Sequence, residues 1–407
     1  MHPDPPPTII PQHARKDLKP HTLYVMAAAC GVSVANIYYN SPLLADFQRY
    51  FNTTADRAGM VATAAQVGYG VGLLFFVPLG DIVERRRVVL IVTVICTFLL
   101  LVLAASPTLN ILILTQFLVG VTATSAQLLI PFGIDLAPAE RRGHTVGVLM
   151  AGLLTGLLGA RVVAGFVGDH LGWRAMFVIG AGLMAMLAVV LHLELPHRAP
   201  TNRMSYAKLM RSLIDLPRQH PQIWPASLVS GLSFGSFMAF WTALSFLMLE
   251  QFNRGASEAG LFGIVALIGV FAAPWAGKLS DSKGPTFTVW LCLLLSAIAF
   301  VLMWGWVTIA SLIIGVLLMD IGVQCIQVAC QSKVMSLAPD ARSRINTLYM
   351  VMRFIGGAAG SMLGALAWSY YRWPGVCGVA IALTVVAAII HLVGTLLDRR
   401  QPNTAGE

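Results

Sequence analysis

The chain has 407 residues, of which 57% are hydrophobic and 11% are charged, and its formal net charge is +9. Soluble domains carry about 25% charged residues and less than half apolar residues, so this composition excludes an ordinary water-soluble fold. Apolar runs near the ~20 residues that cross a bilayer as a helix recur along the whole chain. We therefore expect an all-α membrane protein.

The first segment, residues 1–21, is rich in proline and polar residues and carries Arg15, Lys16 and Lys19 ahead of the first apolar run. It lacks the apolar core and cleavage site of a signal peptide, so we expect a disordered tail. The remaining chain divides into two apolar regions and two polar ones. These are a first bundle at 22–195, a linker loop at 196–224, a second bundle at 225–397 and a tail at 398–407.

Each apolar region contains six windows of the length that a transmembrane helix needs. The loop between the regions is basic, and Tyr206–Leu216 within it is predicted to form a short amphipathic helix on the membrane surface. The twelve predicted spans are 24–46, 58–80, 88–106, 109–134, 143–168, 173–194, 225–250, 257–278, 286–307, 308–334, 343–368 and 374–396.

Lysine and arginine lie mainly on one side of these spans. Twenty fall on the side of the two termini and the linker loop, five fall on the other side, and Arg161 and Arg353 lie within spans. Because cytoplasmic loops of membrane proteins are enriched in Lys and Arg, both termini are predicted to be cytoplasmic, as expected for a multi-pass protein of a bacterial inner membrane. The positive charge thus reflects topology, and no nucleic-acid partner is expected.

The sequence contains no pattern typical of a catalytic, metal or nucleotide site. All six cysteines lie inside apolar runs and have neither metal-ligand nor disulfide spacing. No phosphate-binding Gly-rich loop with its lysine appears either. We expect no enzyme activity, no cofactor and no metal.

The two apolar regions are related by an internal repeat. Asp81 and Asp281, Trp173 and Trp373, and Arg142 and Arg342 occupy matching positions 200 residues apart. This offset predicts two parallel six-helix repeats. Halves of this kind can rock about a site near the middle of the membrane and open it alternately to each side.

The loop after the second span, within Pro78–Arg87, resembles a known signature. Its Asp81, Arg85 and Arg86 match the Gly-x-x-x-Asp-x-x-Gly-Arg-Arg motif of the major facilitator superfamily, although both signature glycines are replaced. In that family the loop is a gating latch between cytoplasmic helix ends. A carboxylate at a helix terminus can bind facing amides and arginines in one state and release them in the other.

The second copy of this loop, Gly277–Gly284, keeps both glycines and the aspartate, as Gly277, Asp281 and Gly284. The resemblance to the major facilitator superfamily covers essentially the whole chain. It implies a twelve-helix fold, a small-molecule substrate and a monomer.

Two stretches, Asn36–Leu44 and Gly172–Ala175, are similar to bacterial efflux permeases of the drug or sugar-efflux type. Two other positions differ from drug/proton antiporters. Gln116 stands where those proteins usually carry an arginine in the fourth span, and Gly156–Arg161 lacks the usual Gly-Pro pair of the fifth. Both proton-coupled efflux and uncoupled transport therefore remain open.

Three charged residues lie deep in predicted spans, where a charge costs ~2.5 kcal/mol or more. Asp320 and Arg353 fall in neighbouring spans, so the hypothesis is that Asp320 carries a proton and pairs with Arg353; the alternative is a permanent structural ion pair. Arg161 has no carboxylate in its own span. It either faces the cavity, binding an anionic substrate or stacking on a ring, or snorkels to the outer surface.

In the family the cavity is lined by the first, fourth, seventh and tenth spans. These spans here carry amides, hydroxyls and aromatic rings, a mixture typical of small-molecule pockets, although such side chains also join helices to one another. The candidate cavity residues are Asn36, Tyr38, Tyr39, Asn40, Gln116, Thr124, Gln127, Ser233, Phe234, Phe237, Trp241, Gln324, Gln327 and Gln331.

Glycines recur in the fifth and eleventh spans and predict close helix approach, either as sliding surfaces or as static packing. They are Gly152, Gly156, Gly159, Gly356, Gly357, Gly360 and Gly364.

The sequence therefore predicts a secondary active transporter that works by alternating access, namely a proton-coupled exporter (antiporter) of a small organic or drug-like solute. One alternative is an uncoupled facilitator or importer of a sugar or other metabolite. A second is a membrane sensor that does not transport.

Overall fold

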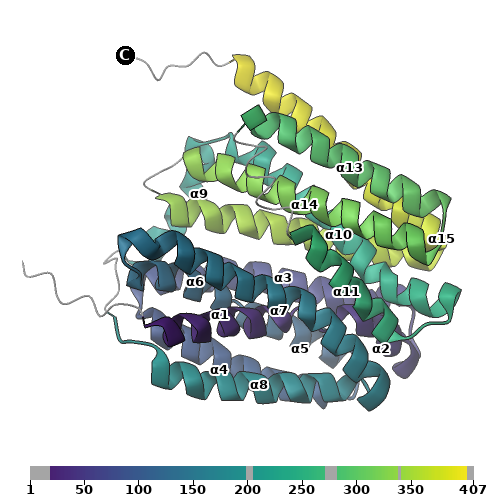
Figure 1. Ribbon diagram of the computed structural model, residues 1–407, viewed down its shortest axis with the longest axis horizontal. Helices are drawn as coiled ribbons and strands as arrows, with labels where there is room; N and C mark the ends of the chain where they lie inside the picture. The colour runs from purple at the N-terminus through teal and green to yellow at the C-terminus, as the bar shows by residue number, and fades with distance from the viewer. Residues whose placement is uncertain (1–18, 199–204, 271–281, 338–340, 401–407) are drawn as a thin grey trace, which may run out of the picture.

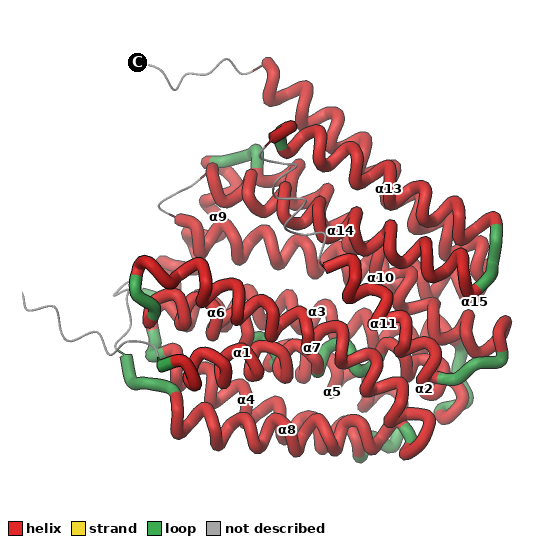
Figure 2. Tube along the Cα trace, in the orientation of Figure 1, coloured by secondary structure: helices red, strands yellow, loops and turns green. Residues whose placement is uncertain are grey.

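The computed structural model describes residues 19–198, 205–270, 282–337 and 341–400. Within these ranges every regular element is a helix, and the helices run side by side in two groups (Figures 1 and 2). We call the end where α1 begins and α15 finishes the terminal end, and the other the opposite end. The first group contains α1 Pro20–Ala35, η1 Ser41–Leu43, α2 Leu44–Tyr50, α3 Ala55–Ile82, α4 Arg85–Ala104, α5 Leu109–Thr122, α6 Ser125–Leu136, η2 Ala139–Arg141, α7 Arg142–Leu171 and α8 Trp173–Glu194.

The second group follows a short helix that lies at the terminal end, α9. Its helices are coloured from teal to yellow in Figure 1. The bounds are α9 Tyr206–Gln219, α10 Ile223–Phe252, α11 Ala256–Val270, α13 Pro285–Gly305, α14 Ile309–Leu337 and α15 Arg342–Arg400.

The helix lengths agree with twelve membrane spans. Among the described residues, nine helical segments are long and apolar enough to cross a bilayer, and α1 and α11 are two shorter apolar helices. One of the nine, α15, contains the eleventh and twelfth predicted spans, divided where Arg372 leaves the helical region. The prediction of an all-α protein with twelve spans is therefore confirmed.

The turn that divides α15 has a counterpart in the first half. Gly172, between α7 and α8, has φ +82°, and Arg372, 200 residues later, has φ +56°. Each is followed by a tryptophan, Trp173 or Trp373, at the start of the next span. A positive φ lets a single residue reverse the chain between two long helices, and glycine adopts it without strain whereas arginine does not. The sequence repeat is thus also a repeat of backbone geometry.

Within each half, the same pair of helices meets at glycine. A Cβ added to Gly156 of α7 would lie 2.1 Å from the carbonyl oxygen of Gly31 in α1. In the second half, a Cβ on Gly356 of α15 would lie 2.2 Å from the carbonyl oxygen of Gly231 in α10. These glycines join helices of one half, so they are packing contacts and not sliding surfaces between the halves.

Two helix pairs join one half to the other. In the α7–α11 pair, a Cβ on Gly260 would lie 2.4 Å from the carbonyl oxygen of Arg161. In the α3–α15 pair, a Cβ on Gly59 would lie 2.3 Å from the Cβ of Ala365. The two halves therefore meet with almost no side-chain volume between these helices.

The first span is interrupted in the middle of the membrane. Pro42 has no N–H to donate to the preceding turn, and the chain tightens there, with Tyr38 N–H donating to Ala35 O at 2.9 Å. The Asn36 amide donates to the Val32 and Ser33 carbonyls at 3.0 and 3.2 Å. The fourth span is also divided, between α5 and α6, whereas α10 and α14 of the second half are continuous.

The linker forms α9, the amphipathic helix expected at Tyr206–Leu216. Leu209, Leu213 and Leu216 are buried on one face. The Tyr206 hydroxyl donates to the Phe75 carbonyl of α3 at 3.2 Å, and α9 also contacts α15. This helix therefore touches both halves at the terminal end.

Gly360→Ala is expected to destabilise the protein, because its Cβ would lie 1.9 Å from the carbonyl oxygen of Gly235 and force α10 and α15 apart. Overpacking of this kind costs about 1–3 kcal/mol. Thermal unfolding of the purified protein in detergent should show a lower Tm. Gly378→Ala in the same helix is the control, because nothing lies within 4 Å of its Cβ position. Equal Tm values for the two variants would contradict the close packing of α10 on α15.

Candidate functional site

Arg161 lies in α7 and is fully buried, with 0% of its surface exposed. Its guanidinium carbon is 4.0 Å from the centre of the Trp241 ring, 4.8 Å from that of Tyr38 and 5.8 Å from that of Phe237. Tyr38 belongs to the first half, whereas Trp241 and Phe237 belong to α10 of the second. The alternative that Arg161 snorkels to the surface is therefore wrong, and the side chain lies between the halves.

The guanidinium of Arg161 has no hydrogen-bond partner in the described part of the chain, on Nε, Nη1 or Nη2. The residues around it, which include Pro42, Leu244 and Ala259, leave no room for a water molecule. A cation held against an aromatic face gains about 2 kcal/mol or more when it is desolvated. Each unsatisfied buried donor costs about 1–3 kcal/mol and a guanidinium has five N–H donors, so the aromatic contacts leave part of the cost uncompensated.

Asp320 lies in α14 and is 1% exposed, and its Oδ2 has no hydrogen-bond partner. Arg161 is near enough to influence the Asp320 carboxylate electrostatically. The two side chains do not form an ion pair, because no Arg161 nitrogen lies within 4.0 Å of that carboxylate. Arg161 is ten residues from the end of its helix and Asp320 eleven from the start of its own. The two charges therefore lie at a similar depth, about 15 Å from the opposite end of their helices.

The expected pair between Asp320 and Arg353 is not formed in this structure. Arg353 donates from Nη1 to the Ser230 hydroxyl at 3.1 Å, and its guanidinium carbon is 4.2 Å from the centre of the Phe234 ring. Ser230 and the Tyr349 hydroxyl lie 2.7 Å apart. Contacts on α10 thus hold Arg353, and Asp320 forms no ion pair with it.

An aromatic row on α10 connects the two arginine sites. The ring centres of Phe234 and Phe237 are 5.7 Å apart, and those of Phe237 and Trp241 are 6.0 Å apart. Phe354 of α15 extends the row to the first half, since its ring lies 5.5 Å from Phe234 and 4.5 Å from Tyr69. The candidate site is therefore a row of rings with Arg161 near one end and Arg353 near the other.

Several predicted cavity residues face the interior of the first half instead. A Cβ added to Gly180 of α8 would lie 3.2 Å from the Tyr39 ring and 3.5 Å from Asn36 Oδ1, so both face α8. The Gln116 amide donates to the Asn36 carbonyl at 3.4 Å, and the Asn40 amide donates to the Ile37 carbonyl at 3.0 Å. These amides support the interrupted first span, because they bind carbonyls within it.

Other candidates in the fourth and tenth spans also make helix contacts. The Thr124 hydroxyl donates to Val121 O at 3.4 Å, and Gln127 lies beside the Tyr69 hydroxyl. The Gln327 carbonyl accepts from Tyr349 at 3.0 Å. The Gln331 amide donates to Asn346 Oδ1 at 2.7 Å, joining α14 to α15.

Of the two remaining candidates, Ser233 is buried and its hydroxyl has no partner, whereas Gln324 is half-buried. Tyr38, Phe234, Phe237 and Trp241 are thus the cavity candidates that the structure brings to the arginines.

Sequence reasoning missed residues of the second and eleventh spans. Gln66 lies beside the Tyr38 hydroxyl, and Tyr69 and Phe354 close the aromatic row. The lining was predicted from four spans only. The sequence did contain a signal for the second span. Gln66 and Tyr69 are three residues apart in an apolar helix, so they share one face.

At the terminal end, the first signature loop forms a network of ionic contacts. Arg85 binds Asp81 at 3.0 Å and Asp135 of α6 at 2.7 Å, and the Ser343 hydroxyl of the second half donates to Asp81 at 3.4 Å. Arg86 donates to the His192 carbonyl of α8. In the second copy, Gly277 and Asp281 lie outside the described residues. Gly284 has φ +84° directly before α13.

At the opposite end, hydrogen bonds join the two halves. The Asp169 carboxylate accepts from the backbone N–H groups of Ala256 and Ser257 at 2.9 and 2.7 Å, at the start of α11. The N–H of Asp56 in α3 donates to the Ser369 hydroxyl at 2.9 Å. These bonds hold α7 to α11 and α3 to α15 at this end of the bundle.

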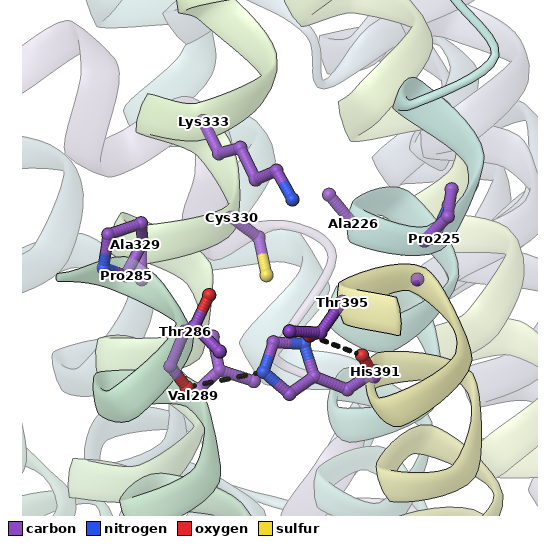
Figure 3. Close-up of a pocket in the computed structure, with 11 residues that line it drawn as sticks. Pro225, Ala226, Pro285, Thr286, Val289, Ala329, Cys330, Lys333, His391 and Thr395 are labelled. Carbon is purple, nitrogen blue, oxygen red and sulfur yellow. Dashed lines mark hydrogen bonds between the residues drawn. The ribbon is translucent and has the colours of Figure 1, made fainter. Parts of the chain in front are cut away.

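A separate small pocket, partly open to solvent, lies within the second half between α10, α13, α14 and α15. Figure 3 shows the Lys333 ammonium and the Cys330 thiol pointing into it, and the His391 ring bonded to the Thr286 carbonyl at 3.2 Å. Among the described residues that line this pocket, none is a predicted site residue. It is not shared between the halves, so it does not have the position that a site for alternating access needs.

A bundle of two repeated six-helix halves, with buried charges between them, defines a membrane transporter. The family model of the Major Facilitator Superfamily matches residues 26–361 and 226–407. The chain therefore belongs to the major facilitator superfamily.

Relatives agree with this assignment. A protein named "Uncharacterized transporter YgaY" from Escherichia coli O157:H7 is 38% identical over 371 residues, which are 90% of this chain and 94% of that one. "Probable transporter SCO4007" from Streptomyces coelicolor is 35% identical, over 89% of this chain and 85% of its own. A crystal structure of a bacterial homologue of the human lysosomal transporter Spinster, inward-facing and unoccupied, aligns with a TM-score of 0.76 at 15% identity, over 95% of this chain and 100% of that one.

Asp169→Ala is expected to favour the state that is open at the opposite end, because it removes two bonds that tie α7 to the start of α11. Loss of a helix-capping carboxylate costs about 1 kcal/mol, which is roughly a fivefold change in the conformational equilibrium. The measurement is the rate at which a membrane-impermeant maleimide labels Ser245→Cys, a buried position beside Arg161.

The control is Arg49→Gln, which breaks the pair with Asp46 at the same end without touching the other half. An unchanged labelling rate in Asp169→Ala would show that this contact does not hold the opposite end closed.

Proposed function

We propose that this chain is a secondary active transporter that exports a small organic solute by alternating access and uses protons as the driving ion. One observation supports this most directly: Arg161 of the first half is buried against rings of the second half, at a depth similar to that of the buried Asp320 of the second half. Any rearrangement of the residues around Arg161 would therefore also alter the contact between the halves. Rocking of the halves about that contact exposes the site to alternate sides.

Asp320 is proposed to carry the proton. Among the described residues it is the one buried carboxylate. When it is ionised, Asp320 attracts Arg161 across the boundary between the halves, and this attraction is strong in a low-dielectric interior. When it is protonated, the attraction is lost. Taking up or releasing a proton therefore alters the free energy of holding the two halves together, which is what coupling requires.

The orientation rests on charge. Lys and Arg are concentrated at the terminal end, so we propose that this end is cytoplasmic, in a bacterial inner membrane. The opposite end, closed by Asp169 and Ser369, would then face outward. The export direction is supported by the similarity of Asn36–Leu44 and Gly172–Ala175 to efflux permeases. The monomeric state is likewise proposed from the family.

A second candidate is uncoupled transport, and one observation favours it. Gln116 stands where antiporters carry an arginine, and its amide supports the broken first span through the Asn36 carbonyl. In that case Asp320 would balance the charge of Arg161 without titrating, and the gradient of the solute alone would set the direction.

Asp320→Asn is expected to abolish substrate-dependent proton movement, because asparagine keeps the shape of the side chain but does not ionise. The measurement uses purified protein in liposomes that contain a pH-sensitive dye, with a panel of drugs, sugars and amino acids. We expect the substrate-dependent proton flux to fall to the level of liposomes without protein.

The control is Asp215→Asn, which removes a solvent-accessible carboxylate of α9. If the solute moves equally in both variants while the wild type shows no proton flux, uncoupled transport is the correct function. If proton flux persists in Asp320→Asn, another group carries the proton.

A further inference from the structure

We propose that the transported solute carries one negative charge on an oxyanion group, such as a carboxylate, and that Arg161 binds this group. The inference rests on the proposed transport function and adds the chemical class of the substrate. The apolar body of the solute would lie against the rings of Phe237 and Trp241, which adjoin the guanidinium.

The first argument is the set of free donors. All three guanidinium nitrogens of Arg161 lack acceptors, although arginine has five N–H groups in a fork that fits an oxyanion. Two neighbours around the same small gap, Trp241 and Ser245, also have a buried Nε1–H or hydroxyl without a partner. A donor-rich site of this kind is satisfied by a ligand that brings acceptors.

The second argument is charge balance. In the middle of the bundle the described buried charges are Arg161, Arg353 and Asp320, which leave one positive charge in excess when the carboxylate is ionised. A monoanion brings the site to neutrality. A cationic solute would add a second unbalanced charge in a medium where each buried charge is costly, so that class is disfavoured.

The third argument is the contrast between the arginines. Arg353 already donates to Ser230 and rests on Phe234. Arg174, on the surface, lies 4.2 Å from the Trp173 ring and 4.4 Å from that of Tyr50, and it donates to the Ser106 carbonyl at 3.0 Å. Stacking on aromatic rings therefore does not by itself leave an arginine without an acceptor. Arg161 differs because it has the rings and lacks the acceptor.

The fourth argument is position. The rings that cover Arg161 come from both halves, so the guanidinium becomes accessible only when α10 moves away from α7. An anion that binds Arg161 then replaces contacts that hold the halves together. Substrate binding and rearrangement of the halves would thus both depend on the Arg161 guanidinium, as a transporter requires.

The experiment uses liposomes with the full-length purified protein, loaded with a small-metabolite extract of bacterial cells. The extract is first separated by ion exchange into anionic, neutral and cationic fractions, and the compounds that leave the liposomes are identified by mass spectrometry. We expect the released compounds to come from the anionic fraction. Release should fall at least about tenfold in Arg161→Gln, since a charge-assisted hydrogen bond contributes about 1.5–3 kcal/mol.

Arg161→Lys is the second variant, because it keeps the charge while removing the fork, and Arg174→Gln is the matched stacked arginine. We expect partial release with Arg161→Lys and full release with Arg174→Gln. Release of neutral or cationic compounds only would overturn the proposed class and leave the transport function standing. Anion release that is equal in wild type and in folded Arg161 variants would overturn the role of Arg161. Release of no compound by the wild type would overturn the transport function and this inference with it.

Discussion

The burial of the Arg161 guanidinium is the constraint on which the central arrangement depends. Its donors are unsatisfied, and aromatic faces recover only part of the free energy lost when the charge leaves water. Two of these rings, Trp241 and Phe237, belong to the second half, whereas Tyr38 belongs to the first. The closed arrangement of the halves is therefore also the arrangement that stabilises this charge.

The backbone around Arg161 makes the same residue part of the helix contact. Its carbonyl oxygen faces Gly260 of α11 at a distance that only glycine permits, while its side chain reaches α10. Within each half, α1–α7 and α10–α15 are also packed through glycine, at matching positions. Close packing through glycine therefore occurs both within the halves and between them. The boundary between the halves differs because it also contains the buried guanidinium of Arg161.

The number of spans and the repeat could be predicted because bilayer thickness fixes helix length and because landmarks recur at one offset. The three buried charges could also be found, since a charge inside an apolar run is conspicuous. Their partners could not be found, because sequence does not fix how α7, α14 and α15 are rotated against one another. The span boundaries also placed Arg161 closer to the surface than it lies. Polarity alone wrongly placed Asn36 and Gln116 in the cavity lining. Their amides instead donate to carbonyl groups of the interrupted first span.

The two copies of the repeat differ at the positions of the three buried charges. Two hundred residues from Arg161 is Ser361, which accepts a hydrogen bond from Thr242 at 3.1 Å. The counterpart of Asp320 is Gly120, packed against the Ala65 carbonyl, and the counterpart of Arg353 is the apolar Leu153. The same positions of the six-helix unit therefore pack without any charge. Since buried charges cost free energy and the other copy folds without them, these three charges are not needed for the packing of the six-helix unit.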